Sequence, residues 1–160
     1  MDRPRVYIET TIPSAYFDER TAPEMVARRE ITRRWWRQAA GKFELLTGAA
    51  VREELMGGPV DRTGAWLRLI DELPLLQSSA AVRDIAAKYI RHKVMPANPS
   101  GDALHLALAS YYRCDYLLTW NFKHLANVNK FRHIQRVSSL FDLFVPQIVT
   151  PPALLGEDHE

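Results

Sequence analysis

Residues 102–121 read DALHLALASYYRCDYLLTWN, which places an acid, an apolar helical pattern and a short apolar strand in direct succession. Asp102 opens the helical pattern, and Asn121 closes the strand. A second strand-like run, VYI at 6–8, ends directly before Glu9. In a parallel sheet, the carboxyl ends of the strands and the starts of the following helices share one edge, where ligands bind. We therefore expect these distant side chains to converge at one edge of a sheet and to hold a metal ion.

The rest of the chain continues this alternation of short apolar strands and helices. We expect strands at 6–8, 43–47, 75–77, 116–120 and 147–150, and helices at 23–40, 49–56, 60–73, 80–94, 101–113 and 127–143. Such alternation is typical of an α/β fold in which helices cover both faces of a parallel sheet. Residues 10–14 are expected to break the first strand. Ser100 is expected to cap the helix that begins at Gly101. We expect one domain over residues 1–150 and a C-terminal turn and tail at 151–160.

The charge of the chain is nearly balanced overall but unevenly distributed. The 160 residues carry a formal net charge of +2, and 47% of them are hydrophobic, as in globular proteins. Residues 28–37 contain five arginines and one glutamate, and residues 122–136 contain four lysines or arginines and no acid. Such patches can steer a polyanion to one face of a protein. They are equally consistent with solvated helix faces, and both interpretations stay open.

Cysteine content and hydropathy indicate a cytoplasmic protein. Cys114 is the single cysteine, so no intrachain disulfide forms and a reducing compartment is expected. We expect a buried, inert thiol there, because no histidine is placed beside it in a recognisable pattern. The N-terminus lacks the apolar core of a signal peptide. No apolar run approaches the roughly 18 residues of a membrane span, so no membrane association is expected.

Three carboxylates are candidates for a metal site. Glu9 follows a buried strand, where it is either a ligand or a cap of the next turn. Asp102 lies in a first helical turn, where free N–H groups and the helix dipole keep a carboxylate ionised, as a hard cation requires. Glu53 and Glu54 are adjacent on a helix and point about 100° apart, so one of them faces the site. We prefer Glu54.

Polar side chains near these acids complete the candidate site. Asn121 can ligate weakly or hold a metal-bound water or a phosphate, although turn chemistry also explains an asparagine there. Thr119 points the same way along the strand and can donate to a carboxylate. Thr10 and His105 are candidates for supporting contacts, and a hydrogen-bonded helix histidine is the alternative for His105. Lys123 can bind a phosphate of the substrate.

Four segments in this order resemble a PIN domain, the nuclease fold of VapC-type toxins of bacterial and archaeal toxin–antitoxin pairs. They are VYIETTIPS at 6–14, VREELMGG at 51–58, GDALHLALA at 101–109 and CDYLLTWNFKHLAN at 114–127. The resemblance extends from about Arg5 to Thr150. It implies a three-layer α/β/α sandwich with a central parallel sheet, and an Mg²⁺- or Mn²⁺-dependent ribonuclease.

The resemblance also implies roles for individual residues. The first-strand acid of the family, usually Asp, corresponds to Glu9, the helix glutamate to Glu54 and the third acid to Asp102. The fourth acid of the family stands in a T-x-D pattern, where this chain has T-W-N and therefore Asn121. Because the Glu9 side chain is one methylene longer than the usual Asp, an ion would bind at a different position. Asn121 carries one negative charge fewer than the acid that the family has there. A one-metal site, a reduced activity and a branch with its own residue set all remain open.

The resemblance favours a metal-dependent endoribonuclease, the toxin of a toxin–antitoxin pair, with RNA as substrate. It also implies an antitoxin protein as partner and a homodimer. Trp35 has the spacing of a core residue, whereas Trp36 can contact a partner protein. The alternative is a non-catalytic PIN-like module that binds RNA or protein. A DNA nuclease also stays open, since the sequence shows no feature that distinguishes a 2′-hydroxyl.

Overall fold

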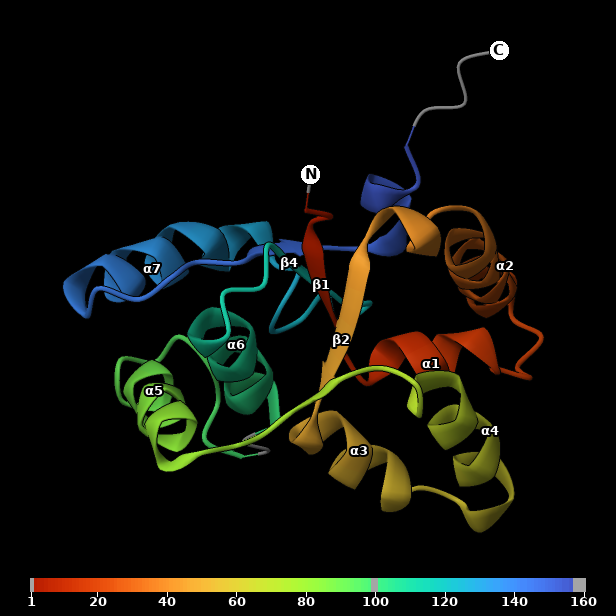
Figure 1. Cartoon of the computed structure of the whole chain (residues 1–160), viewed down its shortest axis with the longest axis horizontal. Helices are drawn as coiled ribbons and strands as arrows, with labels where there is room; N and C mark the ends of the chain where they lie inside the picture. The colour runs from red at the N-terminus through yellow and green to blue at the C-terminus, as the bar shows by residue number, and fades with distance from the viewer. Residues whose placement is uncertain (1, 99–100, 157–160) are drawn as a thin grey trace.

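Five parallel strands form the centre of the molecule. The computed structural model describes residues 2–98 and 101–156, and its sheet has the order β3-β2-β1-β4-β5 (Figure 1). The strands are β1 (Arg5–Ile8), β2 (Glu44–Gly48), β3 (Leu75–Leu76), β4 (Tyr116–Leu118) and β5 (Gln147–Val149). The chain adds β2 and β3 on one side of β1 and then crosses to add β4 and β5 on the other. The order therefore reverses between β1 and β4.

Helices cover both faces of this sheet and make the predicted three-layer α/β/α architecture. The helices are α1 (Thr11–Tyr16), α2 (Pro23–Gln38), α3 (Ala49–Met56), α4 (Val60–Ile70), α5 (Ala80–Arg91), α6 (Gly101–Tyr111) and α7 (Val128–Leu140), with 3₁₀ turns η1 (Ala40–Lys42) and η2 (Pro151–Leu154). Figure 1 shows α1 and α2 on one side of β1 and β2, and α5, α6 and α7 on the other. The predicted α/β fold class is confirmed.

The central strand β1 divides the hydrophobic core into two parts. Val6, Tyr7 and Ile8 are all fully buried. Val6 and Ile8 pack with Trp35 of α2 in one cluster, and Tyr7 packs with α6 residues in the other. This split follows from the two-residue period of a strand, which sends alternate side chains to opposite faces. Both predictions for Trp35 and for the strand at 6–8 are confirmed.

The predicted break of the first strand at residues 10–14 is confirmed, because β1 ends at Ile8, but Thr11–Tyr16 then form helix α1, which was not predicted. Pro13 stands in its first turn, where a missing N–H costs no intrahelical hydrogen bond. Ile12 and Ala15 are buried against the sheet and give the short helix its packing. The predicted cap Ser100 lies outside the described residues.

Three of the helices that end earlier than their apolar patterns predict end in the same way. Each is followed by a non-glycine residue with positive φ: Lys93 (60°) after α5, Arg113 (55°) after α6 and Asp142 (53°) after α7. The residue after each of these is Val94, Cys114 or Leu143. Its backbone amide donates to the carbonyl five residues earlier at 2.8 Å, as in a Schellman motif. The helix thus ends, but the apolar residue that follows the positive-φ residue still packs into the core. The apolar pattern of the sequence therefore continues past the end of the helix.

Cys114 is fully buried, as predicted. Burial raises the pKa of its thiol to about 11, so the nucleophilic thiolate is scarce at neutral pH. Across residues 2–98 and 101–156, no helix is long and apolar enough to cross a membrane.

Gly48, at the end of β2, should tolerate no side chain. A Cβ there would lie 2.5 Å from the Tyr7 hydroxyl oxygen and 2.6 Å from Leu108 Cδ1. We expect Gly48→Ala to lower the free energy of unfolding by about 1–3 kcal/mol, as overpacking does. The control is Gly41→Ala, because a Cβ at Gly41 meets no atom within 4 Å. Urea denaturation measures both, and equal stability of the two variants would contradict the prediction.

Candidate active site at the carboxyl edge of the sheet

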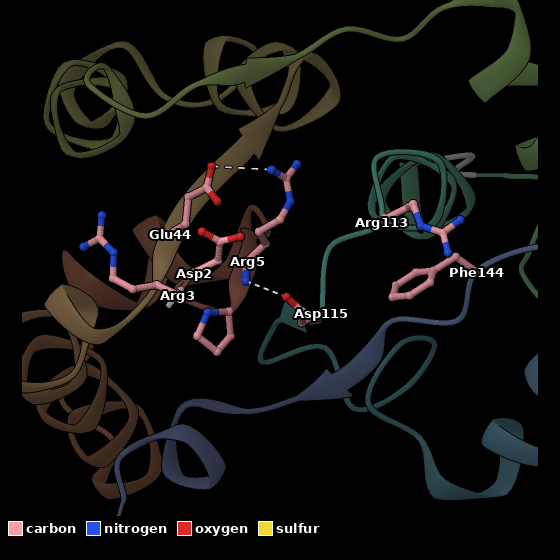
Figure 2. Close-up of a pocket in the computed structure, with 8 residues that line it drawn as sticks. Asp2, Arg3, Arg5, Glu44, Arg113, Asp115 and Phe144 are labelled. Atoms are coloured by element: carbon pink, nitrogen blue, oxygen red, sulfur yellow. Dashed lines mark hydrogen bonds and ion pairs between the residues drawn. The ribbon is translucent and has the colours of Figure 1, made fainter.

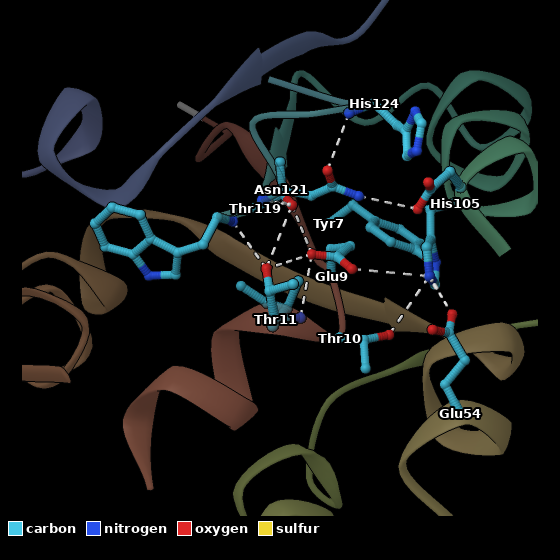
Figure 3. A network of polar contacts seen from close by, with 12 residues as sticks. Tyr7, Glu9, Thr10, Thr11, Glu54, His105, Thr119, Asn121 and His124 are labelled. Carbon is cyan, nitrogen blue, oxygen red and sulfur yellow. Dashed lines mark hydrogen bonds and ion pairs between the residues drawn. The ribbon is translucent and has the colours of Figure 1, made fainter. Parts of the chain in front are cut away.

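The candidate residues gather where the strand order reverses. Glu9 directly follows β1, and its amide donates to Leu118 O, the end of β4, at 3.2 Å. Thr119 and Asn121 follow β4, beside Glu9 (Figure 3). In open parallel sheets this switch point is the usual place for a ligand. The predicted convergence of Glu9 with the end of the 116–120 strand is therefore present.

The Glu9 carboxylate is almost completely buried, with 3% of the residue exposed. Its Oε1 accepts hydrogen bonds from the Thr11 amide (3.1 Å), the Thr11 hydroxyl (2.5 Å) and the Thr119 hydroxyl (2.6 Å). Burial raises the pKa of Glu9, whereas the charge of His105 and these hydrogen bonds act in the opposite direction. Its two oxygens therefore differ: Oε1 is occupied by donors, and Oε2 faces His105.

The imidazole of His105 lies between two of the candidate acids. Its Nε2 contacts Glu54 Oε1 and lies 3.9 Å from Glu9 Oε2, with Thr10 Oγ1 at 3.4 Å (Figure 3). Its Nδ1 is 2.8 Å from the Tyr7 hydroxyl oxygen. The ring is fully buried, so in this arrangement it cannot reach a phosphate in solvent. His105 is the hydrogen-bonded helix histidine that the sequence analysis considered as the alternative.

Charge favours the protonated form of this histidine. Burial lowers the pKa of His105, but the hydrogen bond to Glu54 and the charges of Glu9, Glu54 and Asp102 outweigh burial and raise it overall. The three acids thus surround one imidazole, whose positive charge compensates part of theirs.

Asp102 and Asn121 are joined by a hydrogen bond. Asn121 Nδ2 donates to Asp102 Oδ1 at 3.1 Å. Asn121 Oδ1 accepts from the amides of Lys123 (3.1 Å) and His124 (3.0 Å), which fixes which end of the amide is the oxygen. Asn121 therefore shapes the turn after β4 and orients Asp102. The Lys123 side chain is exposed, while its backbone makes the turn contact.

Glu54 and Asp102 open onto a shared cavity of about 360 Å³. Glu53 lines it as well, but among the described residues no hydrogen bond to His105 comes from Glu53. A Cβ at Gly101 would lie 3.0 Å from Glu54 Oε1, so the glycine leaves room for this carboxylate beside the start of α6. The geometry thus distinguishes Glu54, which joins the network, from its neighbour.

The donor set suits a hard divalent cation. Within residues 2–98 and 101–156, no three His, Cys, Asp or Glu side chains are grouped so as to hold a metal ion together. Mg²⁺, however, keeps several waters and is usually bound through one or two carboxylates plus substrate phosphates. The pair Glu54 and Asp102 meets that requirement, whereas His105 stands between Glu9 and the cavity.

A larger cavity of about 740 Å³ lies at the opposite, amino edge of the sheet (Figure 2). Its polar groups largely satisfy one another: the Arg5 amide donates to Asp115 Oδ2 at 2.7 Å, and Arg5 Nη1 is 3.4 Å from Glu44 Oε1. The Arg113 guanidinium lies over the Phe144 ring. These contacts tie β1, β2 and β4 together at their starts and give this cavity a structural role.

The fold has a solved counterpart, although the sequence matches no protein-family model and no curated protein. A chain in the crystal structure of VapBC2 from Rickettsia felis, bound to a DNA fragment from their promoter, superposes with a TM-score of 0.51. The superposition covers 91% of this chain and 98% of that chain, at 11% sequence identity. This chain has the PIN-like fold.

Within this PIN-like fold, two site residues escaped the sequence analysis. Thr11 binds Glu9 through its amide and hydroxyl, and it also accepts from the Trp120 amide at 2.8 Å. Tyr7 holds His105. A phenol within a buried strand usually has a hydrogen-bonding partner, which is the signal that points to Tyr7. The expected hydrogen bond of Thr119 to a carboxylate is present, at Glu9, and Thr10 Oγ1 lies 3.4 Å from His105 Nε2.

His105 should be important for folding as well as for the site. We expect His105→Leu to lower the free energy of unfolding by about 3 kcal/mol, because Glu9 and Tyr7 stay buried without this partner. The control is His124→Leu, at a histidine whose only described hydrogen bond is made by its backbone. Chemical denaturation followed by tryptophan fluorescence measures both. A His105 variant as stable as the His124 variant would contradict the role assigned to the imidazole.

Proposed function

We propose that the chain is a metal-dependent endoribonuclease and the toxin of a toxin–antitoxin pair. The observation that carries the proposal is the pair of carboxylates, Glu54 and Asp102, that line one cavity between α3 and the start of α6. The likeness of the fold to a VapBC2 chain supports the same class.

Each site residue has a distinct task in this proposal. Glu54 and Asp102 would hold an Mg²⁺ or Mn²⁺ ion, which supplies a bound water of lowered pKa and neutralises the phosphate. His105 orients the Glu54 carboxylate through its contact with Nε2, and Asn121 orients the Asp102 carboxylate through a hydrogen bond from Nδ2. Glu9 lies beneath the site, with its Oε2 3.9 Å from the imidazole Nε2.

The four metal ligands predicted from the sequence are thereby divided into two kinds. Glu54 and Asp102 bind the ion directly in this proposal, because their carboxylates line the cavity. Glu9 and Asn121 act through other residues, because the first is enclosed by threonines and His105 and the second has its amide oxygen engaged by two backbone amides. One bound ion, rather than two, follows from this division.

RNA is the proposed substrate, and Lys123 is a candidate for contact with its phosphates because its side chain is exposed next to Asn121. The proposed partners are an antitoxin and a second copy of the chain. The likeness of the fold to a chain of the VapBC2 structure supports a protein partner. Light scattering after size-exclusion chromatography tests the homodimer.

A non-catalytic RNA- or protein-binding module is the second candidate. It is favoured by the absence of a three-residue metal group within the described part of the chain, and by the neutral amide of Asn121. The two candidate functions differ in one respect. Only the nuclease requires the carboxylates of Glu54 and Asp102 for its activity.

Removal of one open carboxylate charge should abolish cleavage and leave the fold intact. We expect Asp102→Asn and Glu54→Gln each to slow Mn²⁺-dependent cleavage of labelled RNA by about a hundredfold or more, because each loses a ligand of the ion. The matched controls are Asp84→Asn, at an exposed acid of α5 paired with Lys88, and Glu30→Gln, at an exposed glutamate of α2 paired with Arg29. Both controls should retain cleavage.

Parallel reactions on single-stranded DNA of the same sequence separate an RNA nuclease from a DNA nuclease. Isothermal titration of Mn²⁺ into each variant gives a readout besides cleavage. Wild-type protein that binds RNA but leaves it intact with every divalent ion would support the binding module. Cleavage that is unchanged in Asp102→Asn would refute the assigned site.

A further inference from the structure

A mostly apolar groove of about 340 Å³ lies between α7 and β5. Residues from α7, from the segment after it and from β5 line this groove: Phe131, Ile134, Gln135, Val145, Pro146 and Ile148. Val145 is 37% exposed, and Val128, which precedes Phe131 by one turn of α7, is 73% exposed. The apolar surface of the groove therefore continues into solvent.

The groove runs along an outer strand of the sheet. β5 pairs with β4 and has no second neighbouring strand among the described residues. The Gln147 amide donates to the carbonyl just before β4 at 2.9 Å, and the Val149 carbonyl accepts from the amide just after β4 at 3.0 Å. Because backbone groups alternate between the two edges of a strand, the N–H and C=O of Ile148 face outward. Pro146 has no N–H, so further pairing ends there.

Unpaired cations border the groove on its α7 side. The helix carries Lys130, Arg132 and Arg136 and no acid. Arg132 precedes the groove residue Gln135 by one turn, and Arg136 follows Arg132 by one turn. Both arginines are exposed, and neither forms an ion pair within the described part of the chain. The Lys130 ammonium instead donates to Val94 O at 3.1 Å. Two positive charges therefore stand beside an apolar surface with no acid to neutralise them.

We propose that this groove is a docking site for an extended, acidic segment of a partner protein. The segment pairs with the Ile148 backbone as an added strand, inserts apolar side chains into the groove and places carboxylates beside Arg132 and Arg136. Backbone pairing at a sheet edge, with side-chain pockets next to it, is a recurring mode of peptide recognition. A lipid or a nucleic acid has no peptide backbone to complement the strand edge, and the two arginines select an acidic sequence.

The position of the groove separates this partner from one that would mask the candidate active site. Among the described residues, none lines both the groove and the cavity of Glu54 and Asp102. A bound segment therefore leaves those two carboxylates accessible. The inference does not rest on the proposed nuclease activity, because docking requires neither a metal ion nor RNA.

A designed peptide tests the docking site directly. The probe is a short fluorescein-labelled peptide that presents leucine and glutamate alternately on one face, with threonine between them, and fluorescence anisotropy measures its affinity. We expect the wild type to bind it, and to bind the same peptide with lysine in place of glutamate much more weakly. We expect Gln135→Glu, which adds a negative charge to the groove wall, to weaken binding of the acidic peptide about fivefold. The matched control is Gln38→Glu, at an exposed glutamine of α2, which should bind as the wild type does.

Methylation of the peptide backbone tests the strand pairing without any change to the protein. N-methylation of alternate amides along one edge of the peptide removes the donors that face β5, whereas N-methylation along the other edge leaves those donors in place. We expect one of the two methylated peptides to bind about tenfold more weakly and the other to bind as the unmodified peptide does.

Several outcomes would overturn the docking site. They are equal affinity for the glutamate and lysine peptides, unchanged affinity in Gln135→Glu, and equal affinity of the two methylated peptides. Single-stranded RNA and vesicles of phosphatidylcholine with phosphatidylserine serve as further probes, with Arg132→Gln combined with Arg136→Gln as the variant. Binding of either probe that this variant loses, in a protein that does not bind the acidic peptide, would assign the arginines to a polyanion instead. Far-UV circular dichroism checks that every variant is folded.

Discussion

Burial of the Glu9 carboxylate is the constraint around which the site is organised. A buried carboxylate is costly unless hydrogen bonds and a compensating charge surround it. Here Thr11 from α1, Thr119 from the end of β4 and His105 from α6 supply these partners. Each partner comes from a different element, so one side chain joins the end of β1 to three segments. The same contacts that compensate the buried charge therefore set the relative positions of the strand ends and the helix start.

The support for His105 extends into the hydrophobic core. Its Nδ1 partner is the hydroxyl of Tyr7, a residue of the central strand, and that hydroxyl lies close to Gly48 of β2. Its Nε2 partner is Glu54, on the helix that begins directly after Gly48. The packing of β1 against β2 thus determines where the imidazole stands. The imidazole in turn holds the glutamate that lines the cavity.

The sequence predicted the fold better than the site, and particular residues show why. The strand at 6–8 and the core position of Trp35 follow from local periodicity, which a single sequence displays. The helix at Thr11–Tyr16 was missed because its Thr-Pro-Ser composition is typical of turns, and only packing of Ile12 against the sheet stabilises it. The placement of His105 between Glu9 and Glu54 depends on the meeting of three segments far apart in sequence. No local pattern contains that information.

Asn121 fits this charge arrangement better than an aspartate would. Three carboxylates already surround one imidazole, and a fourth beside Asp102 would add like-charge repulsion. The amide instead donates to Asp102 Oδ1, and Asp102 lines the cavity that it shares with Glu54. Its own oxygen is occupied by the turn that carries Lys123 and leads from Phe122 to His124. A neutral residue at this position therefore both orients the Asp102 carboxylate and shapes the turn after β4.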